Sequence, residues 1–195
     1  MKSKFLGLLA IGLLALSGIQ AHATNILTNP GFETGALGPW ALGNDYGAVE
    51  FWNVTGADSQ SGAFSATATG NHELVQWFAP VAVSDIVEAS MWLRMPGTGV
   101  AVAFISFYYS DATSDGELFD ISSDWAKYNV TSLLTPGKFL TGFGVYGCSG
   151  CAEESRTYMD NALVDRVASV PEPGSLALLG LGLAGLGLSR RRRAN

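Results

Sequence analysis

The sequence predicts an all-β domain, a two-sheet antiparallel jelly-roll sandwich, across residues 24–169. Short runs rich in Val, Phe, Tyr, Trp and Thr recur along this stretch, as is typical of strands. Gly, Pro, Asp and Ser separate these runs and indicate turns. No sustained helical period of apolar residues interrupts the series. About nine short strands at regular spacing favour a sandwich of two sheets.

The expected strands follow one another with short turns between them. In chain order they are residues 49–55, 63–69, 73–79, 86–94, 100–109, 117–121, 126–130, 139–146 and 157–167. Residues 95–99 read Met-Pro-Gly-Thr-Gly, and residues 135–137 read Thr-Pro-Gly. Pro presets φ and Gly tolerates positive φ, so both segments favour turns.

The N-terminus has the pattern of a secretory signal peptide over residues 1–23. Lys2 and Lys4 precede an apolar run at residues 5–16, and Ala-His-Ala at residues 21–23 is a small-x-small cleavage site. We therefore expect the exported chain to begin at Thr24.

The C-terminus combines a short motif, an apolar run and a basic cluster. Val-Pro-Glu-Pro-Gly at residues 170–174 precedes the apolar residues 175–188 and four arginines at residues 190–193. We expect the run to form an apolar helix in the membrane, with the arginines held on the cytoplasmic side. The run is shorter than the roughly 20 residues of a normal spanning helix, which favours a temporary handle over a permanent anchor.

This arrangement resembles the PEP-CTERM sorting signal of Gram-negative bacteria. The resemblance implies that an exosortase reads the motif formed by Pro171, Glu172 and Pro173, and that the tail of residues 170–195 is removed. It also implies an inner-membrane intermediate, followed by transfer to the cell surface or to the exopolysaccharide matrix of a biofilm. A permanent C-terminal anchor is the alternative.

The body between the two signals is acidic. Residues 24–169 contain five of the 11 basic and 16 of the 17 acidic residues, which gives a net charge of −11. This charge argues against nucleic acid and anionic lipid as partners. It permits a hard cation such as calcium, although solubility alone also explains it.

The sequence shows no catalytic motif. It lacks a Gly-x-Ser-x-Gly elbow, a His-Glu-x-x-His pair and a phosphate-binding loop, and His72 stands alone in a turn pattern. We therefore expect that the protein is not an enzyme, with a polysaccharide hydrolase as the alternative.

Cys148 and Cys151 predict a small disulfide ring in an oxidising compartment, with free thiols or a redox pair as alternatives.

Four segments of the body resemble jelly-roll carbohydrate-binding modules of the galactose-binding-like class. They are residues 25–35 (NILTNPGFETG), 39–40 (PW), 123–128 (SDWAKY) and 157–164 (TYMDNALV). The resemblance implies a structural calcium ion that joins the first strand to the last. Its matching carboxylates are Glu33 and Asp160, with carbonyls of residues 59–62 as further ligands. Turn carboxylates without a metal are the alternative.

Strand alternation suggests a sugar-binding surface. In residues 86–94, alternation places Glu88, Trp92 and Arg94 opposite the apolar positions. In residues 139–146, alternation places Phe139, Phe143 and Val145 on a core-like face and Leu140 and Tyr146 on the opposite one. If the two strands share a sheet, Trp92 and Tyr146 frame a groove. A half-buried Trp92 covered by a loop is the alternative.

The pattern predicts no binding role for the other aromatic residues of the strands. Trp77 shares a face with Val75 and is expected in the core, and Phe104, Phe107 and Tyr108 lie in a run that is apolar on both faces. The sequence therefore predicts an exported, non-enzymatic module that holds extracellular polysaccharide. An envelope protein without a sugar ligand is the further alternative.

Overall fold

The computed structural model describes residues 23–97, 101–147 and 156–167, with the side chains of residues 45–50 left undescribed. These residues form nine strands: β1 (Ala23–Asn25), β2 (Ala41–Thr55), β3 (Ser65–Ala82), β4 (Ile86–Arg94), β5 (Val102–Tyr109), β6 (Ser114–Asp120), β7 (Ala126–Asn129), β8 (Phe139–Tyr146) and β9 (Arg156–Val167). Two 3-10 turns, η2 (Val83–Asp85) and η3 (Thr131–Leu133), complete the described elements. No helix in these ranges is long and apolar enough to span a membrane. The expected sorting helix lies outside the described residues.

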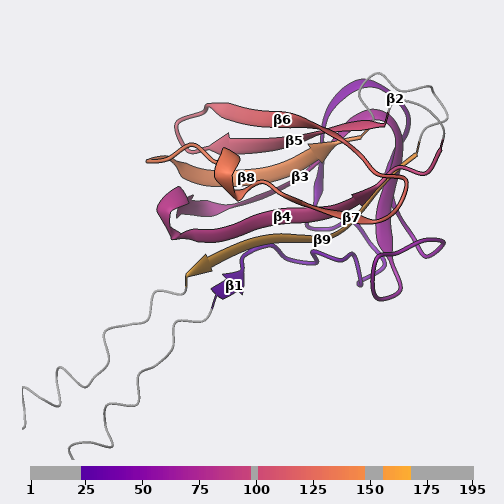
Figure 1. Ribbon diagram of the computed structural model, residues 1–195, viewed down its shortest axis with the longest axis horizontal. Coiled ribbons are helices and arrows are strands. Elements are labelled where there is room, and N and C mark those ends of the chain that lie inside the picture. Colours follow the sequence, from indigo (N-terminus) through magenta and orange to yellow (C-terminus); the bar gives the residue numbers. More distant parts are fainter. Residues whose placement is uncertain (1–22, 98–100, 148–155, 168–195) are drawn as a thin grey trace, which may run out of the picture. The chain divides into compact units, whose positions relative to one another are not determined.

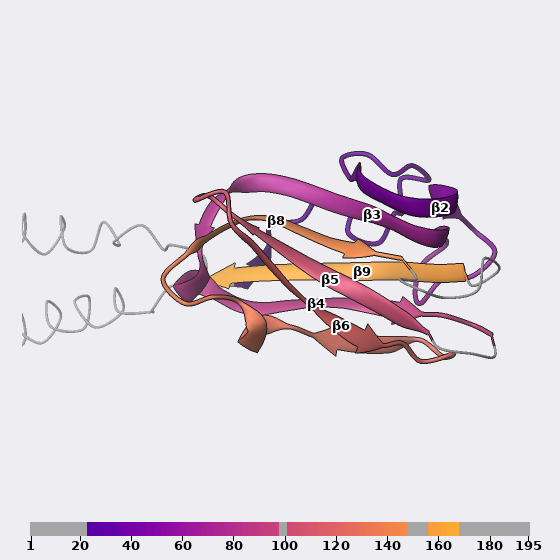
Figure 2. The ribbon, with the colours of Figure 1, turned by 90° about the horizontal axis from the view of Figure 1, so that it is seen from above.

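Hydrogen bonds join the nine strands into one antiparallel sheet. Its order is β6-β5-β8-β3-β9-β4-β7, with β2 beside β3 and β1 beside β9. The two separate sheets expected from the sequence are not observed, because β3 connects the two halves. Residues 66–69 of β3 pair with β9, whereas residues 73–82 pair with β8. Figure 1 shows the strands side by side, and Figure 2 shows β3 running along most of the body.

The sheet curls around a single hydrophobic core. Alternate side chains of β4 and β5 point into this core, as expected for strands with one solvated face. Both halves contribute fully buried residues to the same cluster, among them Met91, Leu93, Ile105, Phe107 and Phe143. The core therefore lies between the β6-β5-β8 half and the β9-β4-β7 half, and the remaining side chains of each half point outward.

The strand prediction is confirmed for most elements. The bounds of β4 and β8 match the predicted residues 86–94 and 139–146. The predicted break at residues 70–72 is wrong, because β3 continues through it. Gly70 adopts a φ of 89° there and pairs with Ala48 of β2, so the bend is absorbed without ending the strand.

The alternation predicted for the start of β8 is also wrong. Leu140 was expected outside and Phe139 in the core, but Leu140 is fully buried and Phe139 is 51% exposed. Register shifts between Tyr108 and Tyr109 on β5 and between Trp77 and Val81 on β3 fall beside these residues. Such an irregularity reverses the face on which the following side chains lie.

The first and last described strands lie side by side. β1 pairs with the end of β9, with Ala23 opposite Val167 and Asn25 opposite Asp165. Asn25 reinforces this closure, since its Nδ2 donates to the carbonyl of Ala162 at 3.0 Å and its Oδ1 accepts from the amide of Val164 at 3.1 Å. The first and last described residues, Ala23 and Val167, are therefore neighbours at one edge of the domain.

Candidate functional site

The outward face of β3, β8 and β5 carries a cluster of aromatic and polar side chains, which we call the aromatic face. Its members are Glu73, Trp77, Phe104, Ser106, Tyr108 and Tyr146. Strand register aligns them in rows across the sheet, because Glu73 and Phe104 both pair with Tyr146, and Trp77 and Tyr108 both pair with Gly142. The intervening residues of the same strands face the core, which fixes the outward direction of the cluster.

Glycines on β8 form the floor between the aromatic rows. A Cβ atom at position 142 would lie 2.7 Å from Cε3 of Trp77, and one at position 144 would lie 2.7 Å from the carbonyl of Leu74. Gly142 therefore leaves room for the Trp77 indole above β8. The ring centroids of Trp77 and Tyr108 are 4.7 Å apart, and Trp77 remains 55% exposed. The result is a shallow surface bordered by ring faces.

Glu73 is the polar centre of the aromatic face. Its side chain is almost fully buried, at 2% exposure, although it points away from the apolar core. The carboxylate accepts hydrogen bonds from the phenol of Tyr108, from Ser106 Oγ at 3.0 Å and from the amide of Asn44 at 3.3 Å. A Cβ atom at Gly43 would collide with Glu73 Oε2, so a glycine is required there.

The phenol of Tyr146 extends this hydrogen-bond network. It accepts from Nδ2 of Asn44 at 3.0 Å and lies 3.5 Å from the phenol of Tyr108. Burial, followed by the hydrogen bond to Glu73, raises the pKa of Tyr108 well above its ordinary value, and burial also raises the pKa of Tyr146. Both phenols therefore keep their protons at neutral pH and remain hydrogen-bond donors.

Chemically, this arrangement suits recognition of a polyhydroxylated ring. Aromatic faces stack on apolar C–H groups, while the carboxylate and phenols exchange hydrogen bonds with hydroxyls. Hydrolysis of a glycosidic bond normally uses a pair of carboxylates across the scissile bond. The aromatic face as defined here contributes one carboxylate, Glu73, whose oxygens already bind neighbouring side chains and backbone.

Of the predicted sugar-binding residues, Tyr146 lies in the aromatic face and the other three do not. Glu88, Trp92 and Arg94 are on the outward side of β4, opposite the buried Met91 and Leu93. Strands β3 and β9 separate β4 from β8 in the sheet. The structure therefore does not bring Trp92 and Tyr146 together, and the groove expected between them is not formed.

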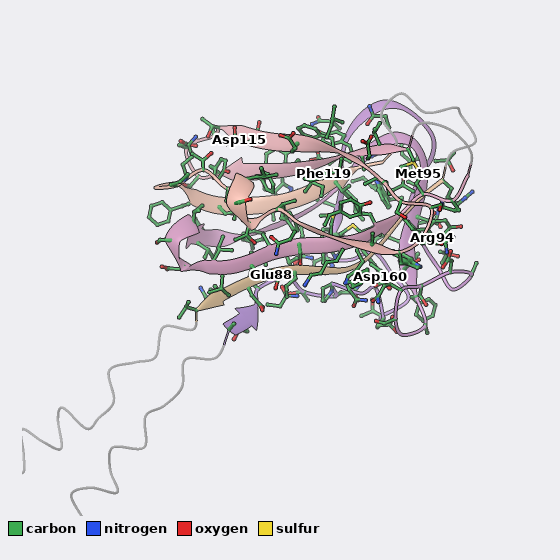
Figure 3. All side chains as sticks on the ribbon, viewed as in Figure 1. Glu88, Arg94, Met95, Asp115, Phe119 and Asp160 are labelled. Carbon is green, nitrogen blue, oxygen red and sulfur yellow. The ribbon has the colours of Figure 1, made fainter. Side chains whose placement is uncertain are left out.

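Glu88 and Arg94 form separate ion pairs on this second face. Lys127 Nζ lies 2.5 Å from Glu88 Oε1, and this hydrogen bond lowers the pKa of Glu88. Arg94 Nη1 lies 2.6 Å from Asp58 Oδ2, and the indole of Trp125 donates to the other oxygen of Asp58 at 3.1 Å. Figure 3 shows Glu88 and Arg94 towards opposite ends of β4.

Of the six members of the aromatic face, the sequence predicts a binding role only for Tyr146. Trp77 is predicted in the core but is exposed, and the sequence predicts no binding role for Phe104 or Tyr108. The prediction that Trp77 and Val75 share a face is correct, but that face is the outward one. Glu73 identifies this face as the outward one. It lies on the same face of β3 as Val75 and Trp77, and its carboxylate would be costly to place in an apolar core.

The predicted calcium ligands meet at one loop. Glu33 accepts from the amides of Ala63, at 3.2 and 3.0 Å, and Phe64, at 3.2 Å. Asp160 Oδ2 accepts from the amides of Gln60 at 2.9 Å and Ser61 at 3.2 Å. The two carboxylates therefore form a clamp on this loop: Asp160 of β9 holds residues 60 and 61, and Glu33, in the loop after β1, holds residues 63 and 64.

The clamp is compatible with a hard cation, although its contacts in the structure are to N–H donors. Burial raises the pKa of Asp160, and the negative charge of Glu33 contributes to the same shift. A cation would relieve this repulsion, with carbonyls completing its shell. In the described residues no group of three or more His, Cys, Asp or Glu side chains gathers as a metal site. Figure 3 places Asp160 on β9.

The expected disulfide, Cys148 to Cys151, lies outside the described residues.

Comparison with known proteins identifies the C-terminal motif. Residues 169–193 match the model of the PEP-CTERM protein-sorting motif. This motif implies export and sorting by an exosortase to the cell surface. No curated protein matches the chain by sequence.

The body structurally resembles carbohydrate-binding modules. A family 61 module solved with β-1,4-galactotriose is 17% identical, with 73% of this chain and 99% of that chain covered and a TM-score of 0.52. The CBM22-1 xylan-binding domain from Paenibacillus barcinonensis Xyn10C is 13% identical, with 78% and 99% covered and a TM-score of 0.54. A family 16 module is 17% identical, with 71% and 97% covered and a TM-score of 0.50. These structural neighbours are mostly non-catalytic modules.

Proposed function

We propose that the aromatic face binds polysaccharide and that the chain is an exported, non-catalytic module of the extracellular matrix. The observation that carries this proposal is the outward cluster of Trp77, Tyr108 and Tyr146 around the buried carboxylate of Glu73. The similarity to carbohydrate-binding modules supports the proposal at the level of the fold.

The geometry favours binding along a glycan chain. Trp77 with Tyr108, and Phe104 with Tyr146 at 5.8 Å between ring centroids, form two ring pairs on either side of the glycine floor. Successive sugar rings lie against these pairs, and Glu73 and the phenols bind their hydroxyls. The net charge of −11 over residues 24–169 disfavours anionic glycans, so we propose a neutral polysaccharide as ligand.

The sorting motif supports the proposed location. An exosortase recognises residues 171–173 while the apolar run holds the chain at the inner membrane, and the processed chain passes to the surface or biofilm matrix of a Gram-negative bacterium. Calcium between Glu33 and Asp160 has a structural role in this proposal, because it holds residues 60–64 against the last strand.

Affinity electrophoresis of the full-length chain through gels containing β-1,4-galactan, xylan or β-glucan tests the proposal. We expect at least one polysaccharide to retard the chain, Trp77→Ala to abolish the retardation and Phe51→Ala to retain it. Phe51 is a matched control, since it is 53% exposed and its ring contacts His72, which is not a member of the aromatic face. Migration unaffected by every polysaccharide favours an envelope protein without a sugar ligand, and sustained release of reducing ends favours the hydrolase.

A further inference from the structure

A second candidate site lies on the outward side of β4 and β9. A cavity of about 250 Å³ is lined by Asn25, Pro30, Ser90, Trp92, Lys127 and residues 161–163, and we call it the Trp92 pocket. It shares no residue with the aromatic face. The core separates the two, because Met91 and Leu93 of β4 and Phe143 of β8 point inward to the same cluster.

A β-bulge creates the Trp92 pocket. Ser90 pairs with Leu163 and Trp92 pairs with Asp160, so one residue of β4 is opposite two residues of β9. Asn161, within the bulge, has a φ of 43°, and its Nδ2 donates to Gln60 Oε1 at 2.7 Å and Ser61 Oγ at 2.8 Å. These bonds hold the bulge in place, and a bulge of this kind bends the strand and opens the surface beside it.

The indole of Trp92 is available to a ligand. Three tryptophans of the domain use their indole N–H within the protein: Trp40 donates to Asn29, Trp52 to His72 and Trp125 to Asp58. Trp77 and Trp92 have no such acceptor among the described residues. The Trp92 N–H is not among the buried polar atoms that lack a partner, so it reaches solvent beside the cavity and can donate to a ligand.

The polar side chains beside this indole carry no net charge. Ser90 Oγ and Lys127 Nζ both donate to Glu88 Oε1, at 2.9 and 2.5 Å. The ammonium group of Lys127 retains two further N–H donors and its side chain is exposed, whereas Ser90 is fully buried. The charges of Glu88 and Lys127 cancel, which favours an uncharged ligand with hydroxyl groups.

We propose that the Trp92 pocket binds one neutral pyranose ring at the end of a glycan chain. The cavity is smaller than the roughly 300–1,000 Å³ of drug-sized ligand sites, which limits it to about one ring. The ring lies against Trp92, with its hydroxyls bonded to the indole N–H and to Lys127. Together with the aromatic face, the pocket gives the domain two saccharide sites on opposite outward faces. The domain then bridges two glycan chains, and this consequence rests on the proposed function of the aromatic face. Sugar binding in the Trp92 pocket does not depend on that function.

Titration of the full-length chain with methyl β-D-galactopyranoside, xylopyranoside and glucopyranoside, followed by NMR of the indole N–H signals, tests the proposal. Single Trp→Phe variants assign the signals. We expect at least one glycoside to shift the Trp92 signal saturably while the Trp125 signal stays in place. The same shift should persist in Trp77→Ala, which separates this site from the aromatic face.

Substitutions in the pocket provide the second measurement. We expect Trp92→Ala to raise the Kd for that glycoside at least about tenfold, a change of about 1.4 kcal/mol, and Lys127→Met to weaken binding less. A stationary Trp92 signal with all three glycosides, or an unchanged Kd in Trp92→Ala, would overturn the proposal. Loss of polysaccharide binding at the aromatic face with the Trp92 shift intact contradicts only the proposed function.

Discussion

The phenol of Tyr108 on β5 donates a hydrogen bond to the buried carboxylate of Glu73 on β3, across the intervening strand β8. Gly142 and Gly144 of β8 have no side chains that would stand between Tyr108 and Glu73. Tyr108 and Glu73 are both members of the proposed binding surface, and their hydrogen bond also stabilises the sheet. A substitution of either residue should therefore affect both stability and binding.

Removal of the Glu73 carboxylate should destabilise the domain. In Glu73→Ala, the hydroxyls of Tyr108 and Ser106 lose their acceptor, and we expect the free energy of unfolding to fall by about 1–3 kcal/mol. Glu73→Gln retains an acceptor oxygen and should lose less. Chemical denaturation measures both. Equal stability of Glu73→Ala and the unsubstituted chain would contradict the assigned role of Glu73.

Alkaline pH should unfold the domain through its tyrosines. Burial raises the pKa of Tyr108 and Tyr146 in the folded state, so the folded chain holds their protons at a pH where the unfolded chain releases them. The stability is fully present below the unfolded pKa of about 10 and falls as pH rises above it. Tyr108→Phe should reduce the steepness of this fall, measured by denaturation at stepped pH. An unchanged slope would show that Tyr108 ionises with its ordinary pKa.

The strands were predictable because each repeats a local pattern. In residues 86–94, Ala89, Met91 and Leu93 alternate with Glu88, Ser90, Trp92 and Arg94, and β4 has the predicted bounds. The aromatic face was not predictable in the same way, because its members come from β3, β5 and β8, which are distant in sequence. Alternation places Trp77 and Val75 on one face but does not say which face meets the core.

Irregular positions account for the remaining errors. Gly70 was interpreted as a strand end, but its positive φ lets β3 turn from β9 towards β8. The register shift beside Leu140 reverses the alternation that was extended from Phe143. The order of strands then separates Trp92 from Tyr146, and strand order depends on long-range pairing that no local pattern encodes.

Calcium removal should lower the melting temperature if the ion joins Glu33 and Asp160. A ligand that binds only the folded state stabilises it by mass action, so we expect a chelator to lower the melting temperature and added Ca²⁺ to restore it. Asp160→Asn keeps the acceptor for the Gln60 and Ser61 amides but loses charge, and it should lose this response. A melting temperature that is identical with chelator and with Ca²⁺ would remove calcium from the account.

Processing should remove the basic tail. Mass spectrometry of the chain recovered from the cell surface should find a C-terminus near residues 171–174 and no arginines from residues 190–193. Replacement of Pro171, Glu172 and Pro173 by Ala should leave the tail in place and the chain in the membrane fraction. Surface protein that retains the four arginines would support a permanent anchor instead.

Calorimetric titration of the full-length chain with β-1,4-galactotriose, xylotriose and cellotriose tests the central claim most directly. The account predicts that at least one trisaccharide binds, that Trp77→Ala raises its Kd at least about tenfold, and that Phe51→Ala leaves the Kd unchanged. Equal affinity in Trp77→Ala and the unsubstituted chain, or heat of binding from none of the three, would contradict a saccharide site on the aromatic face.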